Sequence, residues 1–119
     1  MKILVLDDDK SRLKQFQQKL IGHDVSCVET VSEAIQKLKN DLFDYVFLDH
    51  DLGGKAYVAS GGEEFTGWDV ALWLSKNTDR QPKNIIIHSF NPAGAANMKS
   101  LLPQAQLMPG VWANPGAWF

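Results

Sequence analysis

The chain has 119 residues, which is enough for one domain, residues 1–119, with a single hydrophobic core. Its 12 basic and 14 acidic residues give a formal net charge of −2, so general nucleic-acid binding is not expected. One cysteine excludes an internal disulfide, and no apolar run approaches the ~20 residues of a membrane span. The opening MKILVLDDD is too short in its apolar part for a signal peptide, so we expect a cytoplasmic protein without membrane contacts.

Apolar runs and apolar residues at helical spacing alternate along the chain. The runs KILVL, YVFL and NIII are continuous, as in strands that are covered on both faces of a parallel sheet. In chain order, we expect a strand at residues 2–6, a helix at 10–21, a strand at 25–28, a helix after Thr30, a strand at 45–48, a helix at 67–77, a strand at 84–89, a helix from Pro92 to Leu102 and a short strand at 105–108.

Local residues predict where several helices begin and end. Thr30 with Glu33 forms a capping-box pattern, Asn91 before Pro92 predicts an N-cap and a first helical residue, and Gly22 is a stop signal for the first helix. Strands that alternate with helices of this length indicate an α/β fold. We therefore predict a flavodoxin-like, doubly wound, five-stranded parallel sheet with the strand order 2-1-3-4-5.

Polar residues follow three of the predicted strands at the point where each strand ends. The carboxyl ends of parallel strands share one edge of a sheet, and ligands bind at this edge. Two carboxylates about 5 Å apart repel by roughly 3 kcal/mol at an effective dielectric of 20, which favours recruitment of a cation. Oxygen ligands favour Mg²⁺, with Mn²⁺ as the alternative. The residues concerned are Asp7, Asp8 and Asp9, then Asp49, His50 and Asp51, and finally His88, Ser89 and Asn91.

Some of these residues have a purely structural alternative. Asp9 precedes a helix and is expected to act mainly as its N-cap. Asn91 is also an expected N-cap, although the helix that it starts would direct backbone N–H groups toward a bound anion. Strand alternation places Asp49 and Asp51 on one face and His50 on the other, so His50 either joins the site or lies beside a helix.

The segments ILVLDDD, YVFLDHDL, GWDVALWL and IIIHS resemble, in this order and spacing, the receiver domain of response regulators. The resemblance covers residues 1–102 and implies metal-binding positions at Asp7 and Asp8 and a phosphoacceptor at Asp49. It places the Ser/Thr of receivers at Ser89, or at His88 if the register differs by one residue. The Asp-His-Asp pattern with His-Ser-x-Asn most resembles the cyclic-phosphate processing receivers, in which histidines join the acidic pocket.

The sequence departs from ordinary receivers at three places. Met108 precedes Pro109 where a receiver has a lysine, and residues 53–67 contain an insertion after the third strand. After residue 109 the chain is too short and too rich in Pro and Gly for a fifth helix. We therefore expect a truncated or missing last helix, with the aromatic tail at 110–119 covering the sheet or forming a homodimer.

Three functions are compatible with these features. The first is a metal-assisted phosphoester hydrolase that acts on a cyclic or related phosphate, with Asp7, Asp8, Asp49 and Asp51 as metal ligands. Catalytic roles then fall to Asp49, His88, His50 and Ser89, and Asn91 contributes to binding of a phosphate-containing small molecule. The alternative is an atypical stand-alone receiver that is phosphorylated on Asp49 in a phosphorelay. A third reading is a binding module without catalysis.

Overall fold

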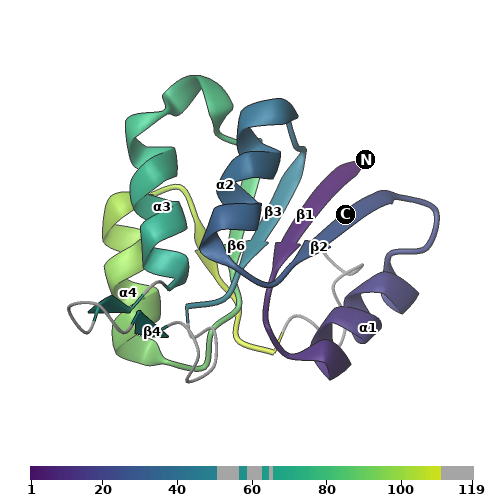
Figure 1. Cartoon of the computed structure of the whole chain (residues 1–119), viewed down its shortest axis with the longest axis horizontal. Coiled ribbons are helices and arrows are strands. Elements are labelled where there is room, and N and C mark those ends of the chain that lie inside the picture. The colour runs from purple at the N-terminus through teal and green to yellow at the C-terminus, as the bar shows by residue number, and fades with distance from the viewer. Residues whose placement is uncertain (51–56, 59–62, 65, 111–119) are drawn as a thin grey trace.

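The computed structural model describes residues 1–50, 57–58, 63–64 and 66–110. Expectations for Asp51, for most of the 53–67 insertion and for the tail after residue 110 lie outside these residues. Four helices and a five-stranded sheet make up most of the described chain (Figure 1). None of the helices in this part of the chain is long and apolar enough to cross a membrane.

The central sheet confirms the predicted fold class. Its strand order is β2-β1-β3-β6-β7, and every neighbouring pair is parallel. Numbered along the chain within this sheet, the order is 2-1-3-4-5, as the sequence predicted. The strands are β1 (Lys2–Leu6), β2 (Asp24–Val28), β3 (Tyr45–Leu48), β6 (Asn84–Ile87) and β7 (Gln106–Leu107).

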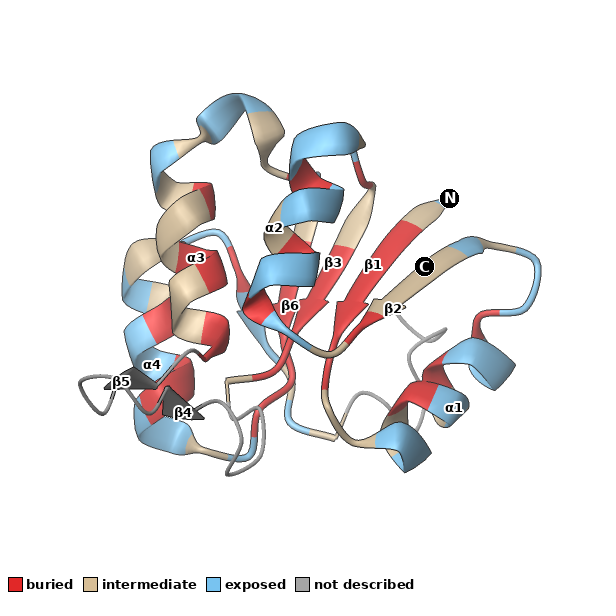
Figure 2. Ribbon diagram, viewed as in Figure 1, coloured by how far each residue is buried: buried red, intermediate tan, exposed pale blue. Residues whose placement is uncertain are grey.

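Helices cover both faces of this sheet, which explains why its strands are continuously apolar. On one face α1 (Lys10–Lys19) places Leu13 and Phe16 against Phe47 of β3. On the other face α2 (Val31–Asn40), α3 (Gly67–Lys76) and α4 (Pro92–Leu101) cover the alternate strand residues, such as Leu48. The helices expose their outward sides while the strand centres are buried (Figure 2).

The helix starts follow the predicted capping chemistry. Asp9 caps α1 by accepting a hydrogen bond from the backbone N–H of Arg12, so its structural role is confirmed. Thr30 accepts from the N–H of Glu33, and Asn91 accepts from the N–H of Gly94. The helix expected at 10–21 ends earlier, at Lys19, and Gly22 follows in the connection with a φ of 96°.

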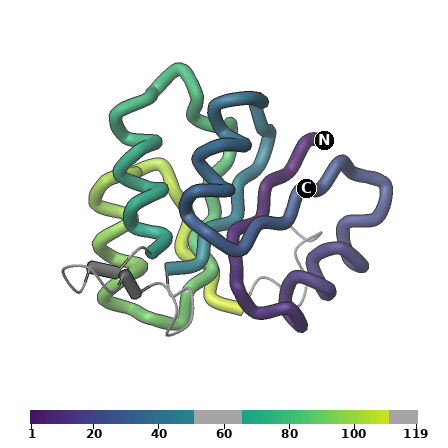
Figure 3. Tube along the Cα trace, viewed as in Figure 1, coloured from purple at the N-terminus to yellow at the C-terminus, as the bar shows by residue number. Residues whose placement is uncertain are grey.

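The residues on either side of the predicted insertion after β3 are in contact with each other. The backbone N–H of Gly67, the first residue of α3, donates to the carbonyl of His50 at 2.9 Å. Two short strands, β4 (Tyr57–Val58) and β5 (Glu63–Glu64), pair antiparallel between these two residues. The tube in Figure 3 shows the start of α3 beside the carboxyl end of β3, so the described residues that flank the insertion are neighbours.

Candidate functional site

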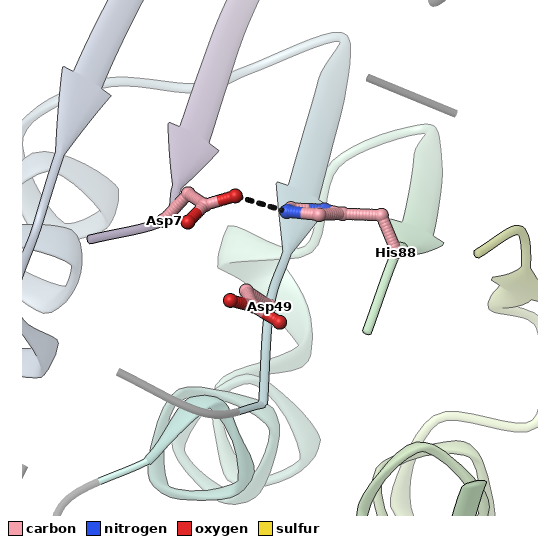
Figure 4. Close-up of side chains that lie close together, drawn as sticks. All are labelled: Asp7, Asp49 and His88. Carbon is pink, nitrogen blue, oxygen red and sulfur yellow. Dashed lines mark hydrogen bonds and ion pairs between the residues drawn. The ribbon is translucent and has the colours of Figure 1, made fainter. Parts of the chain in front are cut away.

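The ends of three adjacent strands bring Asp7, Asp49 and His88 together (Figure 4). Each of these residues directly follows its strand, and its N–H still bonds to the neighbouring strand. Asp49 donates to Leu6 at 3.1 Å and His88 donates to Leu48 at 2.9 Å. One ligand atom from each of the three side chains lies within 4.8 Å of the others, and all three residues are buried. Sheet register therefore fixes this cluster.

Asp7 is the most heavily bonded member of the cluster. Its Oδ1 accepts from the backbone N–H of Asp9 and from Nη2 of Arg12, both at 2.9 Å. Its Oδ2 accepts from Nε of Arg12 at 2.8 Å and from Nε2 of His88 at 3.0 Å. Burial alone would raise the pKa of Asp7, but the hydrogen bonds from His88 and Arg12 outweigh it and lower the pKa to about 2. Asp7 is therefore ionised at neutral pH.

Arg12 belongs to the site although the sequence analysis did not identify it. Its Nη2 also lies 3.3 Å from Oδ2 of Asp49, so one guanidinium joins the carboxylates of two strands. The hydrogen bonds with Asp7 are the main cause of a raised pKa for Arg12. An arginine on the helix that directly follows an Asp-rich strand end was the available signal, because the first turn of this helix lies over the sheet edge.

His88 is buried with 1% of its surface exposed, and burial lowers its pKa despite the neighbouring Asp7. The ring is therefore neutral at neutral pH. Because an ionised carboxylate only accepts hydrogen bonds, the short contact with Asp7 places the proton on Nε2. The lone pair is then on Nδ1, which has no hydrogen-bond partner among the described residues. Phe16 packs edge-on against the ring, with the centroids 5.3 Å apart.

Asp8 lies next to this cluster without joining it. It is half-buried and is not part of the group of converging ligand atoms formed by Asp7, Asp49 and His88. Burial raises the pKa of Asp8, and the negative charge of Asp7 raises it further.

His50 also stands outside the converging group. Its ring lies against Gly94 in the first turn of α4, where an added Cβ would approach the imidazole to 2.5 Å. The structure thus places the ring beside a helix, which was one of the two orientations considered from the sequence.

Ser89 and Asn91 organise the turn that leads into α4. The buried Ser89 hydroxyl accepts from the N–H of Asn91 at 3.0 Å, and Asn91 is the N-cap. The strand predicted at 84–89 ends at Ile87, so His88 takes the first position after the strand and Ser89 the second. Both side chains therefore lie at the sheet edge, and His88 is the one that reaches the carboxylates.

Met108 follows β7 on the same edge. Its N–H donates to the carbonyl of Ile87 at 2.8 Å, and its side chain packs against the core cluster below α1. An uncharged thioether thus follows the last strand, and among the described residues Arg12 is the cation in contact with Asp49.

A comparison with family models identifies the family of the chain. The model described as "Cyclic-phosphate processing Receiver domain" matches residues 2–104. The chain belongs to this family. The match confirms the resemblance inferred from the strand-end motifs and covers the strands β1, β2, β3 and β6 of the sheet. No curated protein matches the sequence.

Solved structures show the same receiver fold. A CheY-like receiver domain from Methanospirillum hungatei has 21% identity and a TM-score of 0.71, over 98% of this chain and 86% of its own. TrrA from Thermotoga maritima, solved with Mg²⁺ and BeF, has 20% identity and a TM-score of 0.71, over 99% and 96%. A response regulator from Burkholderia pseudomallei, with a phosphorylated aspartic acid and a calcium ion, has 17% identity and a TM-score of 0.71, over 98% and 64%.

Proposed function

We propose that this cyclic-phosphate processing receiver is a metal-dependent phosphoesterase that acts on a cyclic or otherwise strained phosphate. The convergence of Asp7, Asp49 and His88 within 4.8 Å carries the proposal. Two buried carboxylates and a neutral imidazole at one strand edge are groups that bind a divalent cation and move a proton.

The donor set fits a divalent metal. Asp7 and Asp49 supply the hard oxygen ligands that Mg²⁺ and Mn²⁺ prefer. The TrrA and Burkholderia structures were solved with Mg²⁺ and a calcium ion, which supports a cation site in a receiver fold of this kind. When bound, the metal would polarise a phosphoryl oxygen and lower the pKa of a bound water. Asp8, and Asp51 outside the described residues, remain further proposed ligands.

The chain's own residues supply the acid–base chemistry in this proposal. His88 is neutral at neutral pH, so it accepts a proton more readily than it donates one, and the unpartnered Nδ1 is its accepting atom. The proposal gives His88 the role of general base. The ring of His50 lies against Gly94 in this structure, so it would have to turn toward the cluster to serve as the proposed general acid for the leaving oxygen. The N-terminal turn of α4, capped by Asn91 and preceded by Ser89, directs backbone N–H groups toward a phosphate.

Turnover of a substrate panel tests the proposal. Cyclic nucleotides and RNA with 2′,3′-cyclic ends are incubated with Mg²⁺ or Mn²⁺, and hydrolysis is measured for the wild type, Asp49→Asn and His88→Gln. We expect at least a hundredfold loss in both variants and none in His23→Gln, which changes a histidine bonded to the N-terminus away from the site. No hydrolysis across the panel, with a metal demonstrably bound, would remove the enzymatic reading. Binding of a phosphate compound without turnover would indicate a binding module instead.

Asp49 also supports the alternative of an atypical receiver. It is 5% exposed at the end of the central strand β3, next to Asp7, and the Burkholderia relative was solved with a phosphorylated aspartic acid. Acetyl phosphate with Mg²⁺ should then add one phosphoryl group to the wild type and none to Asp49→Asn, as measured by intact mass. A wild-type mass that stays unchanged counts against phosphorelay signalling. Met108, in the place of a receiver lysine, favours the hydrolase.

The location, ligand class and oligomeric state of the protein also remain proposals. We propose that it works in the cytoplasm on a phosphate-containing small molecule, without binding nucleic acid in general or membranes. The proposed homodimer through the aromatic tail concerns residues outside the described part of the chain. Sedimentation of the full chain and of a chain ending at residue 110 would test it, since only the full chain should dimerise.

A further inference from the structure

The hydrogen-bonding capacity of Asp7 is already filled. An ionised carboxylate has roughly four lone-pair sites. In Asp7 these face the N–H of Asp9, Nη2 and Nε of Arg12, and Nε2 of His88, at distances from 2.8 to 3.0 Å. A metal ion therefore has no vacant oxygen lone pair at Asp7 in this arrangement. One of the four donors must leave before a metal can bind there.

Arg12 is the donor best placed to leave. The N–H of Asp9 is fixed by the backbone, and His88 is 1% exposed and packed against Phe16. The Arg12 side chain is 25% exposed and extends from the first turn of α1 at the edge of the site. It is also the group that carries the competing positive charge, and its Nη2 lies 3.3 Å from Oδ2 of Asp49 as well.

We propose that Arg12 is a tethered cation that competes with the divalent metal for Asp7 and Asp49, and that metal binding releases its guanidinium to bind the substrate phosphate. This inference rests on the proposed metal site. Without metal, Arg12 neutralises one of the two negative charges and keeps two buried carboxylates compatible with each other. When a metal enters, these carboxylates no longer need the guanidinium.

The released guanidinium has the right chemistry for a phosphate. An arginine remains charged at every accessible pH and presents a planar fork that matches two phosphate oxygens, as it matches two oxygens of Asp7 here. The charge balance also changes. Asp7, Asp49 and Arg12 together carry one net negative charge, and a divalent cation adds two positive charges to this group, so the metal makes the site more favourable for an anion. We therefore expect phosphate to bind more tightly after the metal than before it.

Metal binding in the absence of any substrate tests the first half of the inference. Mn²⁺ affinity is measured by electron paramagnetic resonance, and Mg²⁺ affinity by calorimetry, for the wild type, Arg12→Gln and Lys14→Gln. We expect at least tenfold tighter metal binding by Arg12→Gln. Lys14 lies exposed on the same helix, so Lys14→Gln removes the same charge without touching Asp7 and should stay within threefold of the wild type. Unchanged or weaker metal binding by Arg12→Gln overturns the competition.

The wild type provides a second measurement that does not depend on a folded variant. The Nε–H of Arg12 is bonded to Asp7 at 2.8 Å, so its NMR signal should be protected from solvent exchange without metal. Saturation with Mg²⁺ should abolish this protection. A signal that stays protected with the metal bound would show that Arg12 does not leave, which overturns the inference while the metal site stands.

Inorganic phosphate tests the second half. At saturating Mg²⁺, Arg12→Gln should bind phosphate at least tenfold more weakly than the wild type or Lys14→Gln. Equal phosphate affinity in all three proteins would overturn the role of Arg12 in substrate binding. If neither the wild type nor Arg12→Gln binds any divalent metal, the proposed metal site fails and the inference fails with it, a result that differs from metal binding unaffected by Arg12.

Discussion

Gly67 is the point where α3 touches the backbone of the site. A Cβ added to Gly67 would lie 1.8 Å from the carbonyl oxygen of Asp49, 2.8 Å from its carbonyl carbon and 3.0 Å from Cε of Met98. Real Cβ atoms essentially never come closer than 3.0 Å to another heavy atom. In Gly67→Ala, either the start of α3 or the Asp49 peptide must therefore move by more than an ångström.

The expected cost follows from the nature of the obstacle. Most of the clash is with backbone atoms of Asp49, which cannot rotate away as a side chain would. Overpacking of this kind costs about 1–3 kcal/mol of the free energy of unfolding. For a chain of this size, that corresponds to a fall in the melting temperature of about 4–12 °C. Because the displaced peptide carries Asp49, we also expect weaker metal binding.

Urea unfolding measures this cost. Two of the four tryptophans, Trp68 and Trp73, lie on α3, so tryptophan fluorescence includes a signal from the altered helix. Lys76→Arg, a change of an exposed residue in the last turn of the same helix, serves as the control and should alter the free energy of unfolding by less than about 0.5 kcal/mol. If Gly67→Ala also stays within about 0.5 kcal/mol of the wild type, the start of α3 does not approach the Asp49 backbone as described.

Three further predictions concern the groups around the site. In Gly94→Ala the obstacle is the His50 side chain, so a loss of about 1–2 kcal/mol should be largely restored by His50→Ala in a double-mutant cycle; two additive losses would contradict the contact. The pKa of Asp7 falls from 3.8 in the unfolded chain to about 2 in the folded chain. Above pH 3.8 the ionised Asp7 therefore contributes about 2 kcal/mol to the free energy of unfolding, and this contribution is lost as the pH falls toward 2. Acid unfolding of metal-free protein should thus depend on pH less steeply between pH 4 and 2 in Asp7→Asn, and equal slopes would refute this. The pKa of His88 is lowered from 6.5 by burial, so just below pH 6.5 the unfolded chain binds more protons than the folded chain. The free energy of unfolding, measured by chemical denaturation, should therefore fall as the pH drops from 7.5 to 5.5. This fall should be smaller in His88→Gln.

Local sequence patterns were sufficient to predict the helices, the strands and the helix caps. Asp9, Thr30 and Asn91 cap helices as predicted because each hydrogen bond joins residues only three positions apart. The apolar runs specified strands that are buried on both faces, and their alternation with helices led to the strand order. From that order alone, Asp7, Asp49 and His88 were expected at one edge, since parallel strands end on the same side.

Only the tertiary structure decided which of the candidate side chains meet. Neither the convergence of His88 with Asp7 nor the position of His50 against Gly94 follows from spacing, because both depend on how the chain turns after the strand ends. Arg12 was missed for the same reason: its contacts with Asp7 and Asp49 arise where the first turn of α1 lies over two strand ends. A sequence specifies which residues follow each strand, but the direction of a side chain beyond the strand depends on the packing of helices that are distant in the chain.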